Sequence, residues 1–209
     1  MIWESWPWKR DLARRADALL RRKKQRRWSE ASFAAVERDV FLSAYTVRKL
    51  IEANKLSDEL ESSSLRALKH LPLDRTVDIM NAGTPLNESG SMNLPRARTV
   101  DIMNWHKIDE LYDVSTHVVV SVGLCQFCNQ VVHSFVFSLS MTARGGLDGF
   151  FVASDHTKDR QLLYFSIDAV VNTLLRVADD DIVSLCMSRE AIGKPMKVTR
   201  KSNTLEAGT

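Results

Sequence analysis

A histidine and an asparagine stand four residues apart in the segment LCQFCNQVVHSFVF (124–137). Read as a helix, which Ser121 would cap, this segment places Asn129 beside His133, because residues four apart are neighbours on a helix surface. The opposite face is then apolar and holds Leu124, Phe127, Cys128, Val131 and Phe135. A histidine can act as a general base near neutral pH, and an amide one turn away can orient it. The spacing indicates a candidate catalytic or binding pair.

The three cysteines do not form a metal-binding or disulfide pattern. A structural zinc site needs four converging ligands, usually from two separated pairs, whereas Cys125 and Cys128 are one pair and Cys186 stands alone. We interpret the pair as small apolar residues of the core and expect no metal or cofactor. The sequence also lacks the glycine-rich loops that bind nucleotide phosphates. An odd cysteine number, no secretory signal and no long apolar run favour a reducing, cytoplasmic setting.

Residues 1–28 differ chemically from the rest of the chain. They hold ten basic and three acidic residues, a net charge of +7, whereas the remainder carries −4. Residues 8–28 fit a helix with a narrow apolar stripe. Its candidate nucleic-acid-binding residues are Arg21, Arg22, Lys23, Lys24, Arg26 and Arg27. Three interpretations stay open: binding of nucleic-acid phosphates, contact with an anionic membrane surface through the tryptophans, or a solvated helix that packs on the body.

We expect residues 29–197 to form a single α+β domain, a helical half followed by a small antiparallel sheet with one helix. The clearest helix runs from Ser29 or Glu30 to about Ala53, since its apolar residues step by three and four. Residues 55–72 read as a short helix or turn and then a surface connection. Residues 149–168 have the pattern of a β-hairpin, and Asp168 is the expected cap of the next helix. Residues 198–209 are expected to be disordered.

The sequence RTVDIMN occurs twice, with the copies displaced by 23 positions. Two copies are too few for a stacked repeat fold, so a tandem duplication within the gene is the simplest explanation. We expect residues 98–104 to be the copy that is integrated into the fold, as a short extended segment. Residues 82–95, rich in Gly, Pro, Ser and Asn, would then be a mobile loop.

The segment CNQVVH (128–133) resembles the R-N-x-x-x-H signature of HEPN domains, all-helical modules of many bacterial toxin and defence ribonucleases. Asn129 and His133 match the signature, but Cys128 stands in place of its arginine. The resemblance implies a homodimer with a shared RNA cleft, in which the missing cation would come from Arg48 or Arg144, or else a non-catalytic relative. The chain is also similar to a group of bacterial proteins with a Trp-rich start and no assigned activity.

Three functions follow as hypotheses. The first is a non-catalytic HEPN-like binding or interaction module, and therefore not an enzyme. The second is a metal-independent endoribonuclease that uses His133, with Asn129 and Arg48 beside it. The third is a nucleic-acid-binding protein that acts through the basic N-terminal helix, whose affinity would fall steeply with salt.

Overall fold

The protein has an α+β fold, as the sequence predicts. The computed structural model describes residues 2–73, 99–189, 194 and 196–204. The helices are α1 (Trp6–Lys23), α2 (Glu30–Glu52), α3 (Asp58–Glu61), α5 (Ile108–Leu111), α6 (Leu124–Val132) and α7 (Ile167–Asp179). The strands are β1 (Ser64–His70), β2 (Val118–Gly123), β3 (Ser134–Met141), β4 (Leu147–Ser154), β5 (Leu162–Ser166), β6 (Ser184–Ser188) and β7 (Lys197–Ser202). No helix among these residues is both long enough and apolar enough to span a bilayer.

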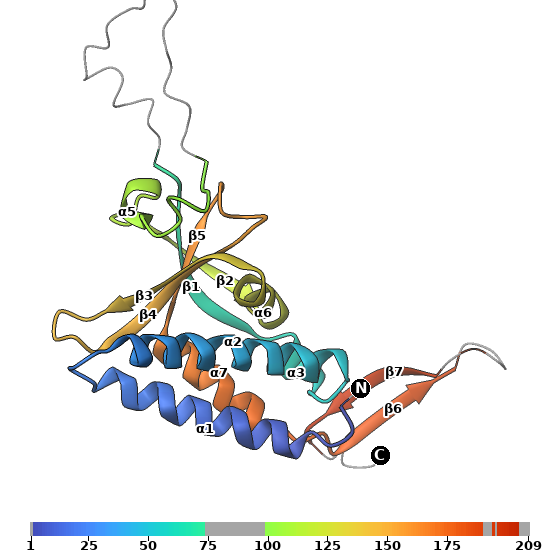
Figure 1. The fold of residues 1–209 in the computed structure, drawn as a ribbon. Coiled ribbons are helices and arrows are strands. Elements are labelled where there is room, and N and C mark those ends of the chain that lie inside the picture. The colour runs from blue at the N-terminus through green and yellow to red at the C-terminus, as the bar shows by residue number, and fades with distance from the viewer. Residues whose placement is uncertain (1, 74–98, 190–193, 195, 205–209) are drawn as a thin grey trace, which may run out of the picture.

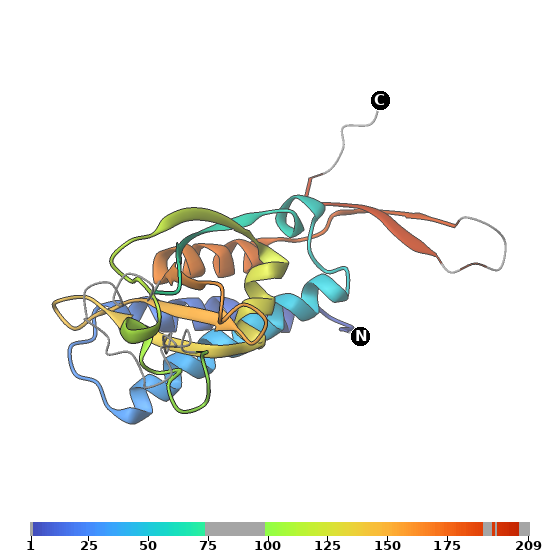
Figure 2. The same cartoon turned by 90° about the horizontal axis from the view of Figure 1, so that it is seen from above.

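Five strands form one antiparallel sheet in the order β2-β1-β5-β4-β3. Helices α1, α2 and α7 lie together beneath this sheet in the view of Figure 1, and α6 lies beside the strands. The strands β6 and β7 form a separate two-stranded ribbon that projects away from the body (Figure 2). The candidate site lies in the helical part, at α2 and the end of α6.

Side chains of the sheet alternate between two apolar clusters, as the two-residue period of a strand requires. In β4, Phe150 and Val152 point into the main core with α1, α2, α6 and α7. Ala153, one residue further, belongs to a second cluster on the other side of the sheet, together with Val136 of β3. Residues 100–112 cover this second cluster with Val100, Leu111 and Tyr112.

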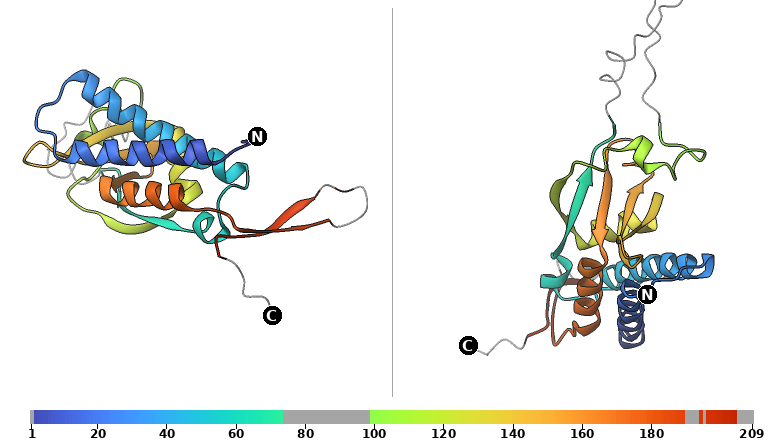
Figure 3. Two further views of the ribbon diagram at one scale, coloured as in Figure 1. Left: turned by 90° about the horizontal axis from the view of Figure 1, so that it is seen from below. Right: turned by 90° about the vertical axis from the view of Figure 1, so that its left-hand side faces the viewer.

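Helix α1 is part of the main core and not an appendage. Its apolar stripe, Leu12, Ala16 and Leu19, is fully buried, and the helix lies alongside α7 and α2 (Figure 3). The side chain of Lys9, also buried, donates a hydrogen bond to the carbonyl oxygen of Asp180 at the end of α7. The N-terminal helix is therefore docked along its whole length through its apolar face.

Two helix predictions are corrected by the structure. The helix expected over 124–137 ends at Val132, because residues 134–141 form β3, and Ser121 lies in β2 while Gly123 holds the cap position. Helix α7 is capped by Ser166, whose hydroxyl accepts from the backbone N–H of Ala169, so Asp168 is not the cap. The long helix α2 and its cap Ser29 are confirmed.

Three predictions about extended and irregular segments are wrong. The expected surface connection contains β1, which lies between β2 and β5 in the sheet. In the described part of the integrated copy, residues 99–101 have no regular structure and residues 102–104 form a turn, so no strand is present, although Val100 is buried. The tail expected to be disordered from residue 198 contains most of β7. Residues 82–95 and the first RTVDIMN copy lie outside the described residues.

Candidate functional site

Arg48 of α2 and His133, the residue that follows α6, are in direct contact. The Nη1 atom of Arg48 lies 2.8 Å from Nε2 of His133, and both side chains reach solvent. A guanidinium can only donate hydrogen bonds, so Nε2 of His133 is the acceptor in this contact. The structure thus places an arginine next to the histidine although the arginine of the HEPN signature is missing from residue 128.

Glu52, one turn after Arg48 on α2, holds two cations at once. Its Oε1 accepts from Nε of Arg48 at 3.0 Å, and its Oε2 lies 2.6 Å from Nζ of Lys49. These hydrogen bonds, first from Lys49 and then from Arg48, lower the pKa of Glu52, and Glu52 in turn raises the pKa of Lys49. One carboxylate shared between two cations leaves this surface with an excess positive charge.

Asn129 does not join this group through its side chain. Only its backbone carbonyl contacts His133, by accepting the hydrogen bond of the His133 N–H at 3.1 Å. Its Nδ2 points to the Sγ atom of Cys125 at 3.8 Å, and its buried Oδ1 has no hydrogen-bond partner. Of the predicted site residues, the structure therefore brings together His133 and Arg48, whereas Arg144 lies in the turn between β3 and β4.

The cysteines of the CxxC segment have different surroundings. Cys128 is fully buried, and desolvation raises the pKa of its thiol to about 12, whereas Cys125 is exposed. Cys186 is exposed on β6, on the ribbon that projects from the body. Within the described ranges no group of three or more His, Cys, Asp or Glu side chains is arranged to hold a metal ion.

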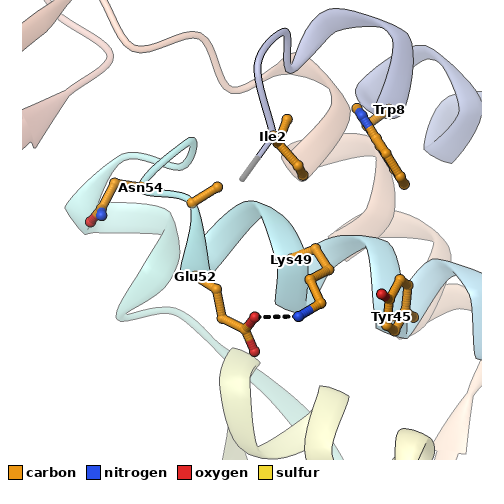
Figure 4. Close-up of a pocket in the computed structure, with 7 residues that line it drawn as sticks. Ile2, Trp8, Tyr45, Lys49, Glu52 and Asn54 are labelled. Carbon is orange, nitrogen blue, oxygen red and sulfur yellow. Dashed lines mark hydrogen bonds and ion pairs between the residues drawn. The ribbon is translucent and has the colours of Figure 1, made fainter.

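A pocket of about 530 Å³ lies between the beginning of α1 and the end of α2 (Figure 4). Its lining residues are Ile2, Trp8, Tyr45, Lys49, Glu52, Ala53 and Asn54. Trp8 and Tyr45 supply two aromatic rings from different helices, and the Lys49–Glu52 ion pair supplies charge. Sequence reasoning missed this pocket: Tyr45 and Lys49 are visibly one turn apart on α2, but only the docking of α1 adds Trp8.

The outward face of α1 is a row of exposed side chains that step by three and four residues. It consists of Trp6, Arg10, Arg14, Asp17, Arg21 and Lys24. At its beginning, the guanidinium carbon of Arg10 lies 4.3 Å from the centroid of the Trp6 ring, a cation–π contact. The row holds four cations against one carboxylate, so the basic character of the N-terminal segment is presented to solvent.

The six predicted nucleic-acid-binding residues divide into two groups. Lys23 forms an ion pair with Asp168 at 2.6 Å, Arg26 donates to the carbonyl of Arg144 at 2.9 Å, and Arg22 donates to Gln25. Lys23 and Arg26 fasten the end of α1 and the following segment to the body, whereas the Arg22 hydrogen bond stays within that segment. The exposed side chains of Arg21, Lys24 and Arg27 have no such partner in the part of the chain that the structure describes.

The HEPN resemblance and the dimer that it implies stay predictions, which rest on the signature at residues 128–133 and, more loosely, on the preceding long helix. Comparison with protein-family models, curated proteins and solved structures finds no match to this chain.

Proposed function

We propose that the protein is a non-catalytic binding module for single-stranded nucleic acid, which it contacts through the outward face of α1. The observation that carries this proposal is how α1 docks: its apolar stripe is buried in the core, while Arg21, Lys24 and Arg27 are exposed and have no carboxylate partner among the described residues. Cations fixed on a folded surface attract a polyanion and release its condensed counterions. A free basic helix would first have to become ordered, at an entropic cost that the docked α1 avoids.

The same observation argues against the membrane alternative. An amphipathic helix binds a bilayer by burying its apolar face at the level of the headgroups. In α1 that face is formed by Leu12, Ala16 and Leu19, all with no exposed area, so it is not accessible to lipid while the protein is folded. Separate exposed apolar side chains, such as Trp3, Trp6 and Leu20, are left for such a contact.

The first test is the salt dependence of binding to a labelled single-stranded oligonucleotide, measured by fluorescence anisotropy. Removing two phosphate-contacting cations in the double variant Arg21→Ala, Lys24→Ala is expected to reduce the slope of log K against log salt by about 1.4, or about 0.7 for each lost contact. Both side chains lie on the same exposed row, so the variant should keep its fold.

The matched control is the double variant Arg66→Ala, Lys69→Ala, which removes the same charge from β1. If both double variants change the slope equally, α1 is not the contact surface and only net charge matters. A wild-type protein that shows no affinity at low salt would refute the nucleic-acid-binding proposal as a whole.

The contact between Arg48 and His133 favours one second candidate, a metal-independent ribonuclease. An imidazole nitrogen can take the proton from a 2′-hydroxyl, and a nearby guanidinium can stabilise the charge on the phosphate. Because Nε2 of His133 accepts from Arg48 in the free protein, a bound phosphate would first have to draw the guanidinium away. This requirement is why we rank binding ahead of cleavage.

For this candidate, His133→Ala is expected to reduce cleavage of a labelled single-stranded RNA by about 100-fold or more in the presence of a chelator. The melting temperature should change little, since the His133 side chain is exposed. Gel analysis of the products checks both the rate and the cleavage positions. Equal cleavage by the wild type and by His133→Ala would assign the activity to a contaminant and leave the protein without ribonuclease function.

A further inference from the structure

The pocket between α1 and α2 presents two aromatic rings that the core does not use. Trp8 is 41% exposed and Tyr45 is 44% exposed, and in Figure 4 both side chains lie at the same cavity. The two rings make no stacking contact with each other, and neither stacks on another aromatic side chain of the described residues. Large aromatic surfaces are normally buried or paired in a protein without a ligand. Among the described residues no aromatic side chain covers either ring, so both rings can stack on a flat ligand.

The charged end of the pocket favours an anion. The Nζ atom of Lys49 lies 5.6 Å from the centroid of the Tyr45 ring and 2.6 Å from Oε2 of Glu52. Glu52 also binds Arg48, so its single negative charge is divided between two cations. A negative group that reaches Lys49 would supply the second anion that the two cations Arg48 and Lys49 lack.

The shape and size of the pocket restrict the class of ligand that can fill it. A volume of about 530 Å³ is in the range of small-molecule sites. Aromatic walls on two helices, next to a lysine, suit a planar ring that carries a negatively charged substituent at its edge. A nucleobase with its neighbouring phosphate has this combination, and every base has a π-face on which tryptophan or tyrosine can stack.

We infer that this pocket holds one unpaired base of a bound single strand, stacked at Trp8 and Tyr45, with its phosphate at Lys49. The inference deepens the proposed function and rests on it. The outward face of α1 then binds the backbone without regard to sequence, while the pocket requires a base that is free of a complementary strand. Double-stranded nucleic acid, whose bases are paired and stacked, cannot fill it.

The experiment compares two 12-nucleotide strands, an oligothymidine and a strand with the same phosphates but abasic sugars. Trp8→Ala is expected to weaken oligothymidine binding by about 5- to 100-fold, the effect of losing one base–aromatic stack. The abasic strand should bind the wild type as weakly as oligothymidine binds the variant, with the salt slope unchanged. Tyr45→Ala, at an exposed position of α2, repeats the test if Trp8→Ala fails to fold.

Trp3→Ala is the matched control, because Trp3 is 86% exposed and does not line the pocket. Equal affinity of the wild type for the abasic strand and for oligothymidine overturns the inference, while the salt slope of the Arg21, Lys24 variant still decides the proposed function. If neither strand binds, the proposed function fails, and a titration with thymidine 5′-monophosphate tests the pocket alone. A shift of the Trp8 indole N–H signal in NMR spectra supports the pocket, and no shift overturns it.

Discussion

Replacing Gly149 by alanine is expected to destabilise the protein by about 3 kcal/mol, at the upper end of the usual cost of overpacking. Gly149 lies in β4 opposite Ser166 of β5. A Cβ atom at this position would stand 2.4 Å from the carbonyl oxygen of Phe165 and 2.6 Å from the ring of Tyr164. The carbonyl belongs to the neighbouring strand of the sheet and cannot retreat without separating β4 from β5.

Urea denaturation followed by circular dichroism measures this loss, and Gly123→Ala serves as the control. A Cβ atom on Gly123 would meet no atom within 4 Å, and its φ of −59° is open to any residue. The control should stay within about 1 kcal/mol of the wild type, because its one expected cost is that alanine is a poorer cap for α6 than glycine. Equal stability of the two variants would show that the two strands are not packed as closely as described.

The second large effect is expected at Asp180, where alanine should cost about 3 kcal/mol of folding free energy. The buried carboxylate accepts from the backbone N–H of Ser57 at 2.8 Å and from the Ser57 hydroxyl at 2.6 Å. Ser57 is the cap of α3, so the truncation leaves a buried donor unsatisfied at the start of that helix.

Asp179→Ala is the matched control, since Asp179 is the exposed neighbour at the end of α7. A carboxylate at the C-terminal end of a helix opposes the helix dipole, so its removal should be neutral or slightly stabilising. Thermal unfolding of the two variants checks the contrast. If Asp179→Ala and Asp180→Ala unfold at the same temperature, the hydrogen bonds of Ser57 contribute nothing to stability.

Much of the fold is predictable because several segments have one unambiguous period. Helix α2 repeats apolar residues at three and four positions, and the β4–β5 hairpin alternates around a polar turn. The segments that form β1 and β3 have no such unambiguous period. Residues 64–70 combine helix-forming Leu, Ala, Arg and Lys with a strand pattern, and SFVF follows a helical segment without a break. For such short apolar runs, tertiary pairing and not local pattern decides between helix and strand.

The sequence could predict individual residues of the candidate site but not the contacts between residues from different helices. His133 stands out by its type, and Arg48 can be named as a possible partner, but their 2.8 Å contact depends on how α2 packs against α6. The same holds for Asn129: the helical hydrogen bond from the His133 N–H to its carbonyl is present, but its side chain points to Cys125 and not to His133. The Trp8–Tyr45 pocket depends on where α1 docks: the apolar stripe of residues 8–28 is compatible with packing on the body but does not say against which helices.

The packing of α1 against α7 has a consequence for folding during synthesis on the ribosome. Leu12, Ala16 and Leu19 emerge early, but α7, which covers them, is not complete until residue 179. At a synthesis rate of about 5–20 residues per second, the interval between the two helices is on the order of 8–30 s. During that time the apolar side of this basic segment has no α7 to pack on, so the N-terminal segment cannot reach its final packing until synthesis of the body is nearly complete.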